Sequence, residues 1–178
     1  DHRESRGLGD VYKRQELKMT VLKACRGIGL PVAQAQEVAA AMAASPWALK
    51  QLLTQLAKPI LTASFDFSIG LDIKNAHILR DFWACADAAY LASPRVCIRG
   101  VSSCDVTEAL ARYRGVSVVA QGEDLLVMVD ERPMLKPARC EVASDEWQQL
   151  ETYAALTYVP ETDASRLVGA GAGLTDND

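Results

Sequence analysis

The chain has 178 residues, of which 49% are hydrophobic and 24% charged, and its formal net charge is −4 at pH 7. This length and apolar fraction fit one globular domain with a sizeable core and argue against disorder. The acidic balance argues against a nucleic-acid partner, because phosphate binding requires a basic face. No apolar run approaches the roughly 20 residues of a membrane helix, so we expect a cytoplasmic protein without a membrane partner.

Cysteine and histidine usage limits the chemistry further. The five cysteines are widely spaced and form no CxxC pair, which favours reduced thiols over disulfides or a zinc site. The sequence holds two histidines, and one of them, His2, falls within residues 1–15, a segment that we expect to be non-native. His77 alone then remains, which excludes a multi-histidine metal site within this chain. We interpret His77 as a surface or helix-capping residue, with a catalytic role as the alternative.

Residues 1–15 resemble a translated laboratory sequence. Asp10–Gln15, DVYKRQ, matches the codons GAT-GTG-TAT-AAG-AGA-CAG of the transposon mosaic end used in sequencing libraries. We therefore expect residues 1–15 to be a non-native, adapter-derived segment, with a native basic tail as the alternative. The domain would then span residues 16–178 and hold 15 basic and 20 acidic residues.

Helices are predicted for the first third of that domain. Apolar residues at a spacing of three to four predict a helix over residues 16–28, and Pro31 opens an alanine-rich second helix. Ser45 and Pro46 begin a short third helix, which Lys58-Pro59 ends. We expect residues 16–58 to form a helical subdomain, a hairpin plus one helix.

Strands and helices are mixed in residues 59–178. Alternating apolar residues predict strands over Phe65–Ile73 and Arg95–Arg99, and two further strands, 116–120 and 125–130, form a predicted hairpin. Helical spacing predicts a helix over 77–92, a helix over 105–115 that opens with a capping box at Asp105, and a last helix from Ser144. The stretch from Arg95 to Ala120 could be a parallel crossover. Its loop GVSSC carries no phosphate fingerprint, so a nucleotide-binding fold is unsupported.

These elements predict one α+β domain. We expect the helical hairpin and its additional helix at the amino terminus, then a small mixed or antiparallel sheet with helices on one side. An ordered, glycine-rich carboxyl-terminal tail completes the prediction.

The most unusual stretch is Thr157–Asp178, TYVPETDASRLVGAGAGLTDND. Its alternating glycines can adopt positive φ and expose successive amides as an anion nest, beside an arginine able to bind a carboxylate or phosphate. The candidate ligand-binding residues are Ser165, Arg166, Gly169, Gly171 and Gly173.

Two alternatives to anion binding exist for this tail. Asp176, Asp178 and the terminal carboxylate could hold a divalent metal such as magnesium or calcium through oxygen ligands. A purely structural tail would pack against the core, with Arg166 paired to Asp163 or Glu161. No other cofactor is evident.

Two further groups could carry chemistry. Cys104, beside Asp105 at a predicted helix start, could be an activated thiol, although an inert thiol next to a capping aspartate is the favoured interpretation. The strand face of Arg95, Cys97 and Arg99 could bind an anionic ligand, although we favour a solvated outer face.

Both ends of the chain resemble one known family. WQQLETYAALTYVPETDASRLVGAGAGLTDND and KACRGIGLPVAQAQEVAAAMA are similar to the end and the opening hairpin of the bacterial proteins grouped as domain of unknown function 3726. The likeness covers most of residues 16–178. It implies a bacterial source and no activity that can be carried over.

The sequence therefore leaves two functional hypotheses. The first is a non-enzymatic accessory or small-metabolite-binding protein, with the oligomeric state left open and an anion-binding turn in its tail. The second is a small metabolic enzyme that uses the Arg, Gly and Asp residues of the tail, with or without a divalent ion. The scarcity of histidine favours the first.

Overall fold

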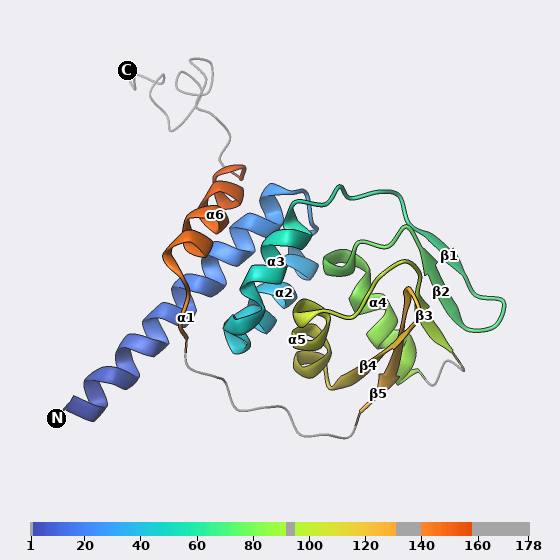
Figure 1. Cartoon of the computed structure of the whole chain (residues 1–178), viewed down its shortest axis with the longest axis horizontal. Helices are drawn as coiled ribbons and strands as arrows, with labels where there is room; N and C mark the ends of the chain where they lie inside the picture. The colour runs from blue at the N-terminus through green and yellow to red at the C-terminus, as the bar shows by residue number, and fades with distance from the viewer. Residues whose placement is uncertain (1, 92–94, 131–139, 158–178) are drawn as a thin grey trace, which may run out of the picture.

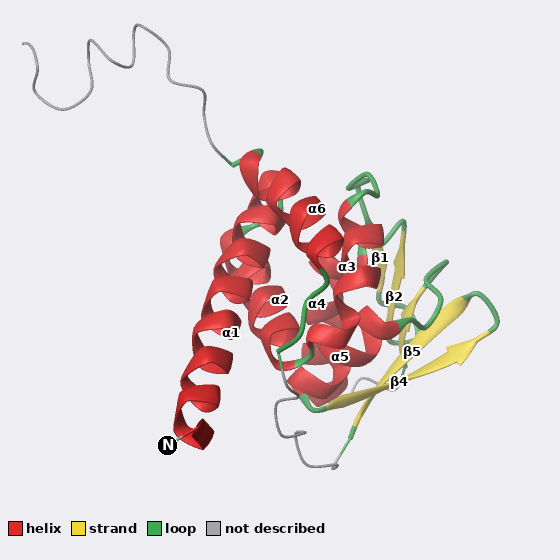
Figure 2. Ribbon diagram, turned by 60° about the vertical axis from the view of Figure 1, so that its left-hand side comes forward, coloured by secondary structure: helices red, strands yellow, loops and turns green. Residues whose placement is uncertain are grey.

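The computed structural model describes residues 2–91, 95–130 and 140–157. These residues form the predicted α+β fold, in which a group of helices and a five-stranded mixed sheet lie on either side of two further helices (Figure 1, Figure 2). The elements are α1 (His2–Gly27), α2 (Val32–Ala44), a 3-10 helix η1 (Pro46–Ala48), α3 (Leu49–Leu56), β1 (Ser64–Asp66), β2 (Leu71–Lys74), α4 (Ile78–Tyr90), β3 (Val96–Ile98), α5 (Asp105–Arg114), β4 (Val116–Gln121), β5 (Asp124–Val129) and α6 (Ser144–Ala155).

The helical group contains the predicted hairpin of α1 and α2, which turns at Gly29 with φ +90°. α6 comes from the other end of the described chain and packs on α1 and α3 (Figure 1). A Cβ atom on Gly27 would lie 2.3 Å from the carbonyl oxygen of Tyr153, so glycine allows α6 to approach the end of α1. The helical group therefore extends beyond residues 16–58.

α1 is longer than the predicted helix. Its buried residues Leu17, Val21, Ala24 and Cys25 follow the predicted apolar spacing. The helix begins at His2 and so continues through the segment expected to be adapter-derived. The origin of residues 1–15 stays a prediction.

The sheet has the strand order β1-β2-β3-β5-β4. β2 and β3 are parallel and joined through α4, whereas the other neighbours are antiparallel. β3 and β4 are also parallel to each other, because both run antiparallel to β5, and α5 joins them. The stretch Arg95–Ala120 therefore forms the parallel crossover considered for it, with β5 inserted between its two strands. β3 and β4 are separated by β5, which forms the predicted hairpin with β4.

Helices cover one face of the sheet. α4 contacts β2, β3 and β5, and α5 contacts β4, all from the same side (Figure 2). Leu71 and Ile73 of β2 are buried under these helices, in register with Val96 and Ile98 of β3. The alternate residues, such as Asp72, project from the opposite, open face.

The predicted single strand Phe65–Ile73 is wrong, because it is a hairpin of β1 and β2. The carboxylate of Asp66 accepts the Ser68 N–H at 2.9 Å, and Gly70 takes φ +127°, so the chain reverses between the strands. The apolar residues stay at odd-numbered positions before and after this turn. Their alternation alone therefore does not reveal that the chain reverses here.

The first turn of α4 anchors the connection between the helical group and the sheet. Arg80 binds both carboxylate oxygens of Asp81 at 2.7 Å and donates to the carbonyl oxygen of Leu61 at 2.7 Å. Asp81 also accepts the backbone N–H of His77 at 2.8 Å. The His77 ring Nε2 lies 3.2 Å from the carbonyl oxygen of Gln55, which fixes the end of α3 against α4.

Candidate functional site

The site residues predicted in the tail lie outside the described residues. These are Ser165, Arg166, Gly169, Gly171 and Gly173 for a ligand, and Asp176 and Asp178 for a metal. Within the described part of the chain, charged side chains gather instead on the open face of the sheet.

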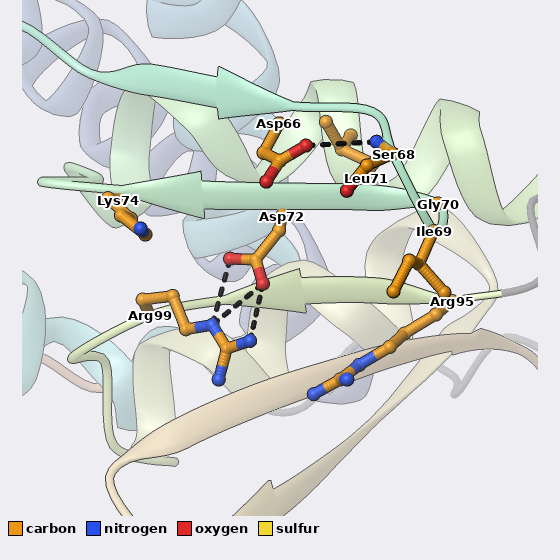
Figure 3. Close-up of a pocket in the computed structure, with 9 residues that line it drawn as sticks. All are labelled: Asp66, Ser68, Ile69, Gly70, Leu71, Asp72, Lys74, Arg95 and Arg99. Atoms are coloured by element: carbon orange, nitrogen blue, oxygen red, sulfur yellow. Dashed lines mark hydrogen bonds and ion pairs between the residues drawn. The ribbon is translucent and has the colours of Figure 1, made fainter.

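That face is hollowed beside the β1–β2 turn, with a volume of about 530 Å³ (Figure 3). The hollow draws residues from three neighbouring segments, the hairpin and both ends of β3. Its lining residues are Asp66, Ser68, Ile69, Gly70, Leu71, Asp72, Lys74, Arg95 and Arg99.

An ion-pair network forms one side of the hollow. Arg99 donates from Nε to both carboxylate oxygens of Asp72 at 2.8 Å, and from Nη1 to Asp124. Asp124 also accepts the backbone N–H of Gly100 at 3.1 Å. The hydrogen bonds from Arg99 and Gly100 lower the pKa of Asp124, and those to Asp72 and Asp124 raise the pKa of Arg99. Arg99 thus holds both carboxylates in place on this side of the hollow.

The other side of the hollow carries Asp66, Lys74 and Arg95. The backbone N–H of Ser68 lowers the pKa of the Asp66 carboxyl group, with a smaller contribution from the charge of Lys74. The Arg95 side chain extends along β3 in the direction of Arg99 (Figure 3). The hollow thus presents three cationic and two anionic side chains, which can bind the acidic group of a ligand and a neighbouring polar group.

The glycine at position 70 allows the first residues of β2 to pack closely against β3. A Cβ atom at this residue would lie 2.1 Å from the carbonyl oxygen of Arg95. That same oxygen accepts the N–H of Leu71 at 2.8 Å. Asp72 is thereby placed beside β3, where Arg99 reaches it.

The sequence identified part of this site. The strand face of Arg95, Cys97 and Arg99 was one of the candidate anion-binding groups, and the structure places that face on the open side of the sheet. Asp72 and Asp124 were missed as the partners of Arg99, because they precede it by 27 and follow it by 25 residues. Cys97 is buried in register with Asp72, so this face is more enclosed than the favoured solvated interpretation implied.

The other candidate groups are held within the fold. All five cysteines are free, as expected, and burial raises the pKa of the Cys25 thiol to about 12. Cys104 is half-buried before α5, where its N–H donates to the Thr107 hydroxyl at 2.9 Å. The capping interaction thus begins one residue before Asp105. His77 occupies the N-cap position of α4 but is not a surface residue, and its burial lowers its pKa.

The described residues contain neither a membrane-spanning helix nor a cluster of metal ligands. None of the helices described here combines the length and apolarity needed to cross a membrane. Within the same residues, no group of three or more His, Cys, Asp or Glu side chains is placed to hold a metal ion. Asp176 and Asp178 lie outside this part of the chain.

Comparison of the chain with protein-family models, curated proteins and solved structures finds no match. The resemblance to domain of unknown function 3726 therefore stays a prediction.

Proposed function

We propose that the protein is a cytoplasmic, non-enzymatic accessory protein that binds a small anionic metabolite in the hollow on the open face of its sheet. The observation that supports this proposal is the placement of Lys74, Arg95 and Arg99 around one hollow of about 530 Å³. A hollow of this size falls within the range of small-molecule sites.

The three cations have different roles in this proposal. Arg99 is neutralised by Asp72 and Asp124, so it shapes the wall of the hollow without having to move. Lys74 and Arg95 flank this wall and donate to the carboxylate or phosphate of the ligand. Asp66 accepts from a hydroxyl or ammonium group of the same ligand.

The tail belongs to the same proposal as a second contact. Ser165, Arg166 and the glycine nest would bind another acidic group of the ligand. The enzyme hypothesis uses these same tail residues and adds a divalent ion held by Asp176 and Asp178. A dependence of ligand binding on magnesium would favour it.

The test is a thermal-shift screen followed by calorimetry, with inorganic phosphate, succinate, citrate and glutamate as probes, each with and without magnesium. We expect at least one probe to raise the melting temperature. Lys74→Ala and Arg95→Ala should each weaken its binding about tenfold, the loss of one charged hydrogen bond. Lys50→Ala, which removes an exposed lysine on α3, is the matched control and should not change it.

Deletion of Gly169–Asp178 separates the hollow from the tail. If the hollow is sufficient, the deletion variant keeps its melting temperature and most of its affinity. The proposal is wrong if no probe binds, or if binding is unchanged in both hollow variants.

A further inference from the structure

The β1 edge of the sheet is exposed and apolar. β1 is the terminal strand, and among the described strands none pairs with its outer side (Figure 1). The exposed fractions of the large side chains around it are 55% for Leu61, 49% for Phe65, 72% for Phe67 and 76% for Ile69. The rings of Phe65 and Phe67 stack with their centroids 6.5 Å apart. Clustered apolar exposure of this kind marks an interaction surface.

This edge lacks the usual protection against strand addition. Proteins commonly protect edge strands with lysine, proline or a bulge. Between Ile60 and Gly70 the sequence contains no proline, and its one charged residue is Asp66. The Asp66 carboxylate already accepts the N–H of Ser68 within its own turn. The edge therefore offers backbone groups for pairing next to aromatic side chains.

We propose that a second copy of this chain occupies the edge, with the two β1 strands antiparallel about a twofold axis at Phe65. In this register Phe65 lies opposite its own counterpart, and the Ser64 hydroxyl lies opposite the Asp66 carboxylate. Opposed aromatic residues stabilise paired strands. A register centred on Asp66 would instead oppose two carboxylates, which is destabilising. The edge is thus complementary to itself in one register.

A second hollow beside Phe65 gives the other copy room. Phe65 pairs with the buried Ile73, so its side chain lies on the helix-covered side of the sheet. There it lines an open hollow of about 510 Å³, whose other lining residues are Pro31, Gln34, residues 60–63, Arg80, Asp81 and Ala84. The twofold arrangement places the Phe65 ring of the second copy next to this hollow. Both rings are then removed from water.

The exposed apolar area sets the expected strength of this dimer. A large apolar side chain buries about 150–250 Å² when fully covered, so the exposed parts of these four side chains offer on the order of 450 Å² per copy. A standard interface buries about 800 Å² per partner. Even with the β1 backbone added, the contact remains below standard size. We therefore expect a reversible dimer whose population depends on protein concentration.

The experiment is sedimentation velocity on the full chain from low-micromolar to millimolar concentration. Phe65→Lys and Phe65→Asp should each weaken self-association about tenfold or more, because each opposes like charges across the axis. A mixture of the two variants should associate again, since residue 65 faces itself. Leu91→Lys is the matched control and should leave association unchanged, because that leucine is 84% exposed elsewhere, at the end of α4.

Several results would overturn the proposal. A wild-type chain that stays monomeric throughout would assign the edge to a different partner. A dimer that survives both Phe65 variants, or fails to re-form on mixing them, uses another surface or register. If circular dichroism shows that Phe65→Lys is unfolded, Phe67→Lys replaces it, since Phe67 is 72% exposed and lies outside β1. Amide hydrogen exchange should slow at β1 as concentration rises, and slowing confined to other elements would contradict the proposal.

Discussion

Substitution of Gly70 by alanine tests how the β1–β2 hairpin is seated against β3. At φ +127° an L-residue is strained, which costs about 1–3 kcal/mol. The new Cβ would also lie 2.1 Å from the carbonyl oxygen of Arg95, so the two strands must separate. That separation weakens the Leu71–Arg95 hydrogen bond, which contributes about 0.5–1.5 kcal/mol. We expect a loss of about 3 kcal/mol in the free energy of unfolding.

The assay is urea unfolding followed by circular dichroism, with thermal melts in parallel. A loss of about 3 kcal/mol lowers the melting temperature by roughly 6–12 °C in a chain of this size. Gly122→Ala is the matched control, because Gly122 also has positive φ, +64°, but no atom lies within 4 Å of its added Cβ. Strain alone should cost this control about 1–2 kcal/mol. Equal losses in the two variants would refute the close approach of Gly70 to β3.

Three further predictions concern the core and its pH dependence. Burial lowers the pKa of His77, so the unfolded state takes up a proton that the folded state resists. The free energy of unfolding should therefore fall as the pH drops below 6.5, the ordinary pKa of histidine. Urea unfolding at pH 5.5 and 7.5 should show a smaller fall for His77→Gln than for the unsubstituted chain. Gly27→Ala should displace α6, because the new Cβ would lie 2.3 Å from the carbonyl oxygen of Tyr153. The cost of overpacking, about 1–3 kcal/mol, outweighs the gain of about 1 kcal/mol in helix propensity. Faster amide hydrogen exchange in α6 would reveal this displacement. Phe82→Ala should cost about 3–5 kcal/mol in urea unfolding, because Phe82 is fully buried, whereas Phe67→Ala at an exposed position should cost less than about 0.5 kcal/mol.

The helices could be predicted from the sequence because their signals are local. Apolar spacing and glycine or proline boundaries located α2 and α4 within a few residues, and the turn at Gly122 located the β4–β5 hairpin. The same local signals gave a wrong prediction for Phe65–Ile73, which is a hairpin and not one strand. There the turn lies inside an alternating pattern, in which Gly70 falls in line with the polar residues Asp66, Ser68 and Asp72. The hairpin is distinguished from one strand by pairing across the turn, such as that of Asp66 with Asp72, which alternation does not reveal.

The open-face site could be predicted only in part, for the opposite reason. Its cations at Arg95 and Arg99 stand two residues on either side of Cys97, a spacing that a strand places on one face. The anions that position Arg99 come from β2 and β5, and nothing within either strand indicates which neighbour it will have. Composition instead drew attention to the tail, where unusual residues are adjacent in sequence. A stretch of unusual residues in the sequence therefore does not indicate which residues the fold brings together in space.

The β1–β2 hairpin links the two proposals while leaving them separable. The hollow on the open face is lined by Asp66 at the end of β1 and by Ser68 and Gly70 of the turn, whereas Phe65 of β1 lies at the sheet edge. Gly70→Ala shifts the hairpin as a unit, so both metabolite binding and self-association should weaken. Lys74→Ala removes one charge from the hollow and should affect binding alone. If Phe65→Lys weakens association but leaves binding intact, the edge and the open face act as independent surfaces of one hairpin.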